Sequence, residues 1–407
     1  MSKKLYSLLV VLVLSAMILA ACAPAAATEA PVPTTAPTEA PVLTTAPTEA
    51  PALTTAPTEA PAQTEAPTEA VVSTTAPTEA ATAAATQPPA ANIKVCEVTD
   101  TGGIDDKSFN ATAWKGVQDA IDNLGIEGKY LESQQQTDYE TNINAFLEEG
   151  CDLIITVGFL LGDATLAAAQ ANPDQKFAIV DYAYDQDVPN TAQLVFSTDQ
   201  AAFLAGYVAA GTTQTGTVGT FGGLNIPTVT IFMDGFSYGV KYYNDQNSAN
   251  VNVLGWNTDT QDGLFTGNFE STEDGRTMGI NLMDEGADII MPVAGPVGLG
   301  TAAAIQERGN AWIIGVDTDW TVSASEYTPI VLTSVMKNMD VAVYTQIQDV
   351  INGTFKGGIV TGTLENNGVD IAPFHDNESA VPDAVKSALP DLKQGIISGD
   401  IQTSPSQ

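Results

Sequence analysis

Acidic residues stand directly after three predicted strands of this 407-residue chain. Asp100 and Asp181 each follow a short apolar run, and Asp317 follows the strongly apolar run Trp312–Val316. Carboxylates there accept hydrogen bonds from the N–H and O–H groups of a ligand. An Asp after a strand also serves as a turn or helix-capping residue. Because ligands of open α/β sheets bind beyond the carboxyl ends of the strands, we expect a binding site at these positions.

Five further residues are candidates for the same site. Phe109 and Asn110 open the first predicted helix. The ring of Phe109 can stack on a ligand, and the amide of Asn110 can donate and accept hydrogen bonds. Their alternative roles are a core ring and a helix cap. Lys337 is one of few basic residues, and its alternative role is that of a surface lysine. Phe269 is a second candidate for stacking on a ligand. Gly295 permits close backbone approach to a ligand.

The sequence shows no arrangement of residues that is typical of a catalytic site or a metal site. The only histidine, His375, stands outside the predicted strand-end loops, and no Cys/His cluster has metal-ligand spacing. The string Gly235-Phe236-Ser237-Tyr238-Gly239 has the Gly-x-Ser-x-Gly spacing, but it lies inside a predicted helix and is no strand-to-helix elbow, and no phosphate-binding P-loop occurs. Asp105 and Asp106 are adjacent, which favours solvated or capping acids over a catalytic pair. We therefore expect a protein that is no enzyme and has no metal and no cofactor.

The elements that must position these residues begin at Asn92, where short apolar runs alternate with helical patterns. We predict strands at 94–99, 129–132, 152–157, 177–180, 217–221, 252–255, 288–292 and 312–316. We predict helices at 108–123, 138–149, 164–171, 201–210, 228–244, 271–285 and 300–308. Continuous apolar strands separated by helices are typical of parallel sheets buried on both faces. The length favours two doubly wound α/β lobes around a cleft.

The first 91 residues have a different composition. Lys3 and Lys4 precede an apolar run, and small residues lead to Cys22, as in a lipoprotein signal peptide with a lipidated cysteine. Five ten-residue units, each ending Ala-Pro-Thr-Glu-Ala, follow from Pro31. A segment so poor in large apolar residues cannot offset its ordering entropy. We predict a signal peptide at 1–21 and a lipidated, disordered tether at 22–91.

The charge balance of the chain limits its partners. Fourteen Lys and Arg stand against 49 Asp and Glu, and the net charge of −35 repels nucleic acid and anionic lipid. The lipid, and no basic patch, would then hold the protein at the membrane. Cys96 and Cys151 could pair in an exported protein, but each also fits a small buried hydrophobe. We favour two free thiols.

Several motifs together resemble one known family. The segment Val98–Gly116 reads Val-Thr-Asp-Thr-Gly-Gly-Ile-Asp-Asp-Lys-Ser-Phe-Asn-Ala-Thr-Ala-Trp-Lys-Gly. It resembles the basic membrane protein family of lipoproteins, the purine-nucleoside receptors of ABC importers. Further matches are Ala202–Tyr207, Gly235-Phe236 with Gly239–Lys241, Gly286–Asp288, Gly315–Asp319 and Thr333–Asn338. The resemblance covers nearly all of 92–372.

This resemblance implies a type I periplasmic-binding-protein fold with three crossovers between lobes. It implies lobes of 92–198 plus 326–356 and of 199–325 plus 357–407. Asp100 and Asn110 would bind the base, Phe109 would stack on it, and Asp317 and Lys337 would bind the ribose and balance each other. The segment 257–267 departs from the family pattern, which makes Trp256 a rival of Phe269 for stacking. Gly298 is a second candidate for close backbone approach.

The leading hypothesis is a receptor, lipid-anchored on the extracytoplasmic face of the cell membrane, that delivers a purine nucleoside to ABC permease subunits. A ligand sensor that signals to a membrane partner would use the same receptor chemistry. A structural surface-display protein is the third hypothesis, and it predicts no stabilisation by any small molecule.

Overall fold

The computed structural model describes residues 92–405 of the chain. The predicted signal peptide, Cys22 and the whole predicted tether lie outside these residues. Among the described residues, no helix combines the length and the apolar character needed to cross a membrane.

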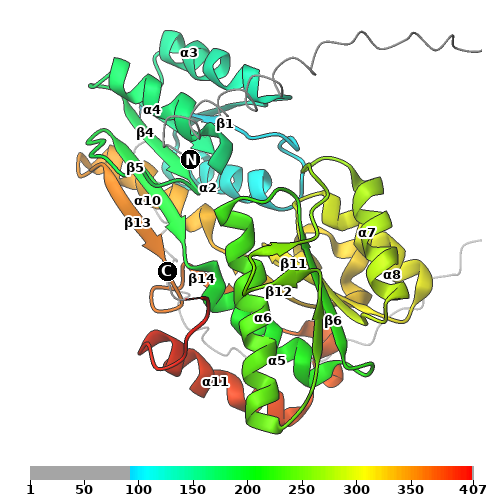
Figure 1. Cartoon of the computed structure of the whole chain (residues 1–407). Coiled ribbons are helices and arrows are strands. Elements are labelled where there is room, and N and C mark those ends of the chain that lie inside the picture. The colour runs from blue at the N-terminus through cyan, green and yellow to red at the C-terminus, as the bar shows by residue number, and fades with distance from the viewer. Residues whose placement is uncertain (1–91, 406–407) are drawn as a thin grey trace, which may run out of the picture. The chain divides into compact units, whose positions relative to one another are not determined.

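The first of two large sheets has six strands that all pair in parallel, in the order β13-β5-β4-β3-β1-β2. Its strands are β1 (Lys94–Val98), β2 (Glu127–Leu131), β3 (Leu153–Val157), β4 (Lys176–Val180), β5 (Thr191–Phe196) and β13 (Gly358–Gly362). Helices α2 (Phe109–Leu124) and α10 (Met339–Asn352) pack together on one face, and α3 (Tyr139–Glu149) and α4 (Gly162–Ala171) cover the other. We call this sheet with its helices the first lobe (Figure 1).

The second sheet also has six strands, in the order β14-β12-β11-β10-β6-β7. Its strands are β6 (Thr217–Gly222), β7 (Asn252–Leu254), β10 (Ile289–Val293), β11 (Trp312–Asp317), β12 (Val331–Lys337) and the antiparallel edge strand β14 (Val369–Ile371). Helices α5 (Thr198–Thr212) and α6 (Pro227–Asn247) pack together, as do α7 (Thr272–Asp284) and α8 (Val297–Arg308). We call this sheet with its helices the second lobe (Figure 1).

Further elements complete both lobes. They are the two-stranded hairpin β8 (Trp256–Asn257) with β9 (Asp262–Gly263), the helices α9 (Trp320–Ser323) and α11 (Asp383–Ile397), and the 3-10 turns η2 (Gln136–Asp138), η3 (Phe159–Leu161), η4 (Ser325–Ile330) and η5 (His375–Ala380). The hairpin covers the first part of the segment 257–267, which departs from the expected family pattern.

The chain passes between the lobes three times: after β5, after β12 and after β13. Two strands pair differently from our expectation. We expected 326–356 in the first lobe, but β12 pairs with β11 in the second sheet. We expected 357–407 in the second lobe, but β13 pairs with β5 in the first sheet. We predicted no strand beyond residue 316, and the sheet that each of these strands joins is set by the strand with which it pairs.

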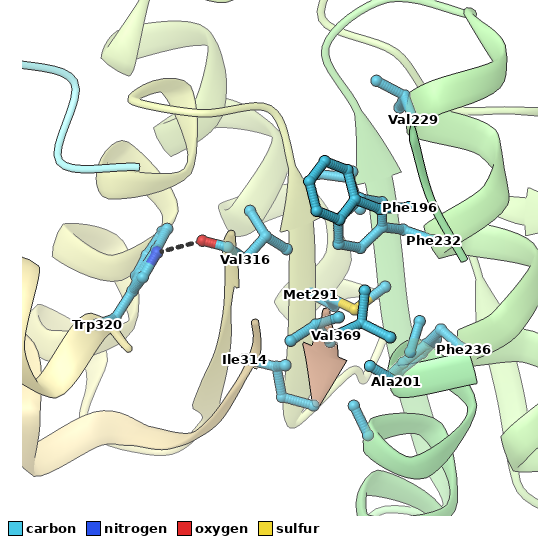
Figure 2. Close-up of a cluster of buried hydrophobic side chains, with 14 of the residues drawn as sticks. Phe196, Ala201, Val229, Phe232, Phe236, Met291, Ile314, Val316, Trp320 and Val369 are labelled. Carbon is cyan, nitrogen blue, oxygen red and sulfur yellow. Dashed lines mark hydrogen bonds between the residues drawn. The ribbon is translucent and has the colours of Figure 1, made fainter. Parts of the chain in front are cut away.

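The cores of the two lobes are built from strand side chains that point alternately to the two faces of each sheet. In the first sheet, Cys96 and Val98 pack toward α3 and α4, whereas Val95 packs toward α2. Figure 2 shows part of the larger cluster, in which the indole N–H of Trp320 donates to the carbonyl of Val316 at 3.0 Å. This bond fixes the turn after β11, the strand that carries Asp317.

Cys96 and Cys151 form a disulfide with a Cα–Cα distance of 6.0 Å, so our expectation of two free thiols was wrong. Cys96 lies in β1, and Cys151 lies just before β3, the strand that pairs with β1. Strand pairing brings the two thiols together, and the sequence separation of 55 residues gave no sign of it. An exported location is compatible with the bond.

Candidate functional site

A cleft that encloses about 580 Å³ of space not filled by protein atoms, part of it open to solvent, lies between the strand ends of the two sheets. Eight of the ten candidates that the sequence singled out line it. They are Asp100, Phe109, Asn110, Asp181, Phe269, Gly295, Asp317 and Lys337. The strand-end residues Asp100, Asp181 and Asp317 reach the cleft because the carboxyl ends of parallel strands lie at one edge of each sheet, as in other open α/β sheets.

Asp100 lies in the loop after β1 and is nearly buried. Its carboxylate accepts hydrogen bonds from the Tyr139 hydroxyl and, at 2.7 Å, from the N–H of Thr101. Burial raises the pKa of Asp100 to about 6, although these two hydrogen bonds lower it. The amide of Asn110 accepts from the N–H of Asp100 at 3.3 Å and donates to the carbonyl of Gly103 at 3.1 Å. Asn110 therefore shapes the loop that carries Asp100.

Asp106 caps the first turn of α2, as we expected for one of the adjacent acids. Its carboxylate accepts from the N–H groups of Ser108, Asn110 and Ala111 at 2.8–3.0 Å. The side chain lines the cleft and is 3% exposed. Burial raises its pKa to about 7, while the three N–H donors lower it. Asp106 thus fixes the start of the helix that presents Phe109.

Asp317 ends β11 and points across the cleft. The hydroxyl of Ser108, at the start of α2 in the first lobe, donates to its Oδ2 at 2.7 Å. Burial raises the pKa of Asp317, while the charge of Lys337 and the bond from Ser108 lower it. A buried carboxylate that lines a cleft is a strong acceptor for hydroxyl or N–H donors.

Lys337 ends β12, and its ammonium donates to Oδ2 of Asp181 at 2.5 Å. Both side chains are nearly fully buried, with 3% and 6% exposure. Burial raises the pKa of Asp181, and the charge of Lys337 lowers it. We expected Lys337 to balance Asp317, but its hydrogen bond goes to Asp181, and its effect on Asp317 acts through space. Only the meeting of the two lobes determines this partner.

Aromatic side chains form the apolar part of the cleft. The ammonium of Lys337 lies 4.9 Å from the ring centroid of Phe109 and 5.5 Å from that of Phe232. Phe269, from the segment before α7, and Phe159, after β3, also line the cleft. Flat rings of this kind offer stacking surfaces to a planar ligand.

Some residues of the cleft escaped the sequence analysis, and two candidates lie elsewhere. Phe159 lies two residues after the predicted strand 152–157, so the strand-end criterion applied there would have found it. Phe232 lies inside α6, where no local pattern separates a cleft ring from a core ring. Trp256 is not among the cleft residues, and its indole donates to Asp234 at 2.8 Å. Gly298 is also outside the lining, because it packs against Trp320 and Pro292.

Among the described residues, no group of three or more His, Cys, Asp or Glu side chains is arranged to hold a metal ion. The chemistry of the cleft is that of reversible binding: acceptors, one ammonium and aromatic rings. Such a set matches a small polar molecule with a planar part.

Comparison with known proteins agrees with this geometry. Residues 93–407 match the family described as "ABC transporter substrate-binding protein PnrA-like", the Bmp family. The chain belongs to this family. The Bmp family consists of solute-binding proteins and is not a family of enzymes, and the resemblance inferred from the sequence motifs is confirmed.

Relatives of the Bmp chain span most of its length. An ABC transporter nucleoside-binding protein of Lactococcus lactis is 32% identical over 75% of this chain and 88% of its own length. An uncharacterized lipoprotein of Pyrococcus furiosus is 33% identical over 70% of this chain and 71% of its own. A solute-binding protein of an ABC transporter system from Aeropyrum pernix has a TM-score of 0.70 at 29% identity and covers 77% of this chain and 94% of its own. The periplasmic-binding type of α/β fold is thereby confirmed.

Proposed function

We propose that this Bmp protein captures a purine nucleoside in the cleft between its lobes and presents it to the permease subunits of an ABC importer. The main support is the set of groups that line one cleft. Asp100 from the loop after β1 and Asn110 from α2 belong to the first lobe, and Phe109 of the same lobe supplies a flat ring. Asp317 ends β11 in the second lobe. The name of the Lactococcus lactis relative as a nucleoside-binding protein supports the same ligand class.

The charges of the cleft favour an uncharged ligand. Four carboxylates line it, those of Asp100, Asp106, Asp181 and Asp317, and Lys337 is the one basic side chain in the lining. Its ammonium is already paired with Asp181. A phosphorylated ligand would enter a negative, poorly hydrated site without a cation to neutralise it. We therefore expect nucleosides to bind and the corresponding nucleotides to be rejected.

Titration calorimetry of the full chain tests this proposal. Purine nucleosides, pyrimidine nucleosides, the matched nucleoside monophosphates, sugars and amino acids are compared at one pH and salt concentration. A nucleoside at 100 times its dissociation constant should also stabilise the fold by about 2.7 kcal/mol. Binding of a sugar or an amino acid with no response to any nucleoside would refute the nucleoside assignment and leave the fold unaffected.

We further propose that the protein is a lipoprotein held by Cys22 on the extracytoplasmic face of the membrane, with residues 23–91 as a tether. The sequence around Cys22 supports this, as does the description of the Pyrococcus furiosus relative as a lipoprotein. The strongly acidic chain makes direct attachment to an anionic lipid surface unfavourable.

A further inference from the structure

Two residues of the cleft share a strained backbone conformation. Asp181 has a φ of 67° and Asp317 a φ of 69°, both in the left-handed region. Each follows or ends a strand, β4 in the first sheet and β11 in the second. A residue with a Cβ atom avoids this region unless its surroundings stabilise it, and such residues gather at functional sites.

Both aspartates contact the opposite lobe. Asp181 of the first lobe accepts from Lys337 of the second lobe at 2.5 Å. Asp317 of the second lobe accepts from Ser108 of the first lobe at 2.7 Å. The two interactions are reciprocal: each lobe supplies one left-handed aspartate and one donor for the aspartate of its partner lobe.

The ammonium of Lys337 has little freedom to move away from Asp181. Ring centroids of Phe109, Phe196 and Phe232 lie 4.9, 5.6 and 5.5 Å from it. Two of these rings belong to the first lobe and one to the second. Separation of the lobes would therefore break the ion pair and expose the ammonium to water at the same time.

Lys337 also adjoins a crossover between the lobes. The next residue, Asn338, donates through its backbone N–H to the carbonyl of Gly368 at 2.9 Å and through its side chain to the carbonyl of Asn367 at 2.6 Å. Residues 363–368 form another crossover. The position of Lys337 is thereby coupled to the part of the chain that must bend when the lobes move.

We propose that Asp181–Lys337 and Asp317–Ser108 form a reciprocal clasp that favours the closed arrangement of the lobes before a ligand arrives, and that Asp181 is the positioning residue for Lys337. In this role Asp181 occupies one N–H of the ammonium and leaves the others for the ligand. The part of this inference that concerns the ligand rests on the proposed function, whereas the clasp itself does not require a nucleoside.

The key variant is Asp181→Asn. Asparagine is nearly isosteric and tolerates the left-handed conformation, so the change removes the charge and keeps the backbone. Asp185→Asn is the matched control, because it makes the same change at an exposed position of the same loop. Lys337→Met and the double variant with Asp181→Asn complete a mutant cycle, and Ser108→Ala tests the second half of the clasp.

The distance between the lobes is measured by single-molecule energy transfer in the full chain. Dyes are placed on cysteines introduced by Glu148→Cys in α3 and Gln246→Cys in α6, both exposed positions in different lobes. Without ligand, we expect Asp181→Asn to shift the ratio of closed to open molecules on the order of tenfold toward the open form. Asp185→Asn should leave that ratio unchanged, and Ser108→Ala should shift it in the same direction as Asp181→Asn.

Positioning makes a second, kinetic prediction. Asp181→Asn should raise the dissociation rate of a bound purine nucleoside on the order of tenfold, with a smaller change in the association rate. The double variant Asp181→Asn with Lys337→Met should lose no more nucleoside affinity than the more affected single variant, since both changes break the same interaction. Additive losses in the cycle, or equal ligand-free distance distributions for Asp181→Asn and the unaltered chain, would overturn the clasp. A normal clasp with no nucleoside binding at all would instead refute the proposed function alone.

Discussion

Gly368 approaches Gly362 so closely that a Cβ atom on Gly368 would lie 2.2 Å from the Cα atom of Gly362. Gly362 ends β13 in the first lobe, and Gly368 immediately precedes β14 in the second. The carbonyl of Gly362 accepts from Ser197 at 2.9 Å, and that of Gly368 accepts from Asn338 at 2.9 Å. All three crossovers are therefore joined at this pair of glycines.

Gly368→Ala should destabilise the protein by about 3 kcal/mol, the upper part of the range for overpacking, because the obstructing atom belongs to the backbone. Denaturant unfolding measures this loss. Gly353→Ala is the control, since a Cβ atom there meets nothing within 4 Å and only the positive φ of 69° opposes it. Its expected cost is about 1–2 kcal/mol. Equal losses in both variants would show that the contact of the crossovers has no energetic importance.

Asp317→Ala should weaken nucleoside binding by more than about 1.5 kcal/mol, because a charge-assisted hydrogen bond is lost from a desolvated cleft. If Asp317 binds the ribose, the variant should also lose preference for a nucleoside over its free base. Phe109→Ala is the comparison: it should weaken both by about 1–3 kcal/mol if the ring stacks on the base. Calorimetry of the folded variants measures these affinities. Unchanged nucleoside affinity in both Asp317→Ala and Phe109→Ala would refute the assignment of the cleft as the binding site.

The pH dependence of stability should report on Asp100. Its folded-state pKa of about 6 lies above the ordinary value of 3.8, so the folded protein binds more protons than the unfolded chain between these values. The stabilising contribution is complete below about pH 4 and is lost as the pH rises through about 6. Asp100→Asn should remove this loss, worth on the order of 3 kcal/mol.

Denaturant unfolding at pH 4, 5, 6 and 8 measures the difference in unfolding free energy between the unaltered chain and Asp100→Asn. The variant should gain relative stability as the pH rises. Asp105→Asn, at an exposed position close by, serves as the control. A difference that is constant with pH would contradict the raised pKa of Asp100.

Reduction of the Cys96–Cys151 disulfide should lower the free energy of unfolding. The bond closes a loop of 55 residues, for which the chain-entropy relation gives about 4 kcal/mol. Unfolding with and without a reducing agent measures the change. Cys96→Ala combined with Cys151→Ala should show no further response to reduction. An equal response in that variant would mean that the reductant acts elsewhere.

Cys22→Ser should abolish lipidation and move the processed protein from the membrane fraction to the soluble fraction. A single nucleophilic thiol carries the anchor in this proposal, and each buried CH₂ of a lipid chain contributes about 0.8 kcal/mol to membrane binding. Mass spectrometry and membrane fractionation check the outcome. Processed, unlipidated protein that stays on the membrane as firmly as the unaltered chain would disprove the anchor.

The sequence by itself was sufficient for the fold class and the family, and it selected candidate residues that the fold brings together in one cleft. Apolar runs reveal buried parallel strands because both faces of such a sheet are covered. Acids at the ends of these strands, such as Asp100 and Asp317, must then lie at one edge of each sheet. That reasoning is local in the chain, and the three aspartates Asp100, Asp181 and Asp317 line the cleft for this reason.

The tertiary structure decided the pairings between distant segments. Cys96 meets Cys151 because β1 pairs with β3, and Lys337 meets Asp181 because two separate sheets face each other. β12 and β13 join sheets opposite to those expected because no local pattern in the sequence identifies the strand with which each of them pairs. Each of these contacts joins residues at least 55 positions apart or in different lobes, and the energy that selects the partner arises only when the chain is folded.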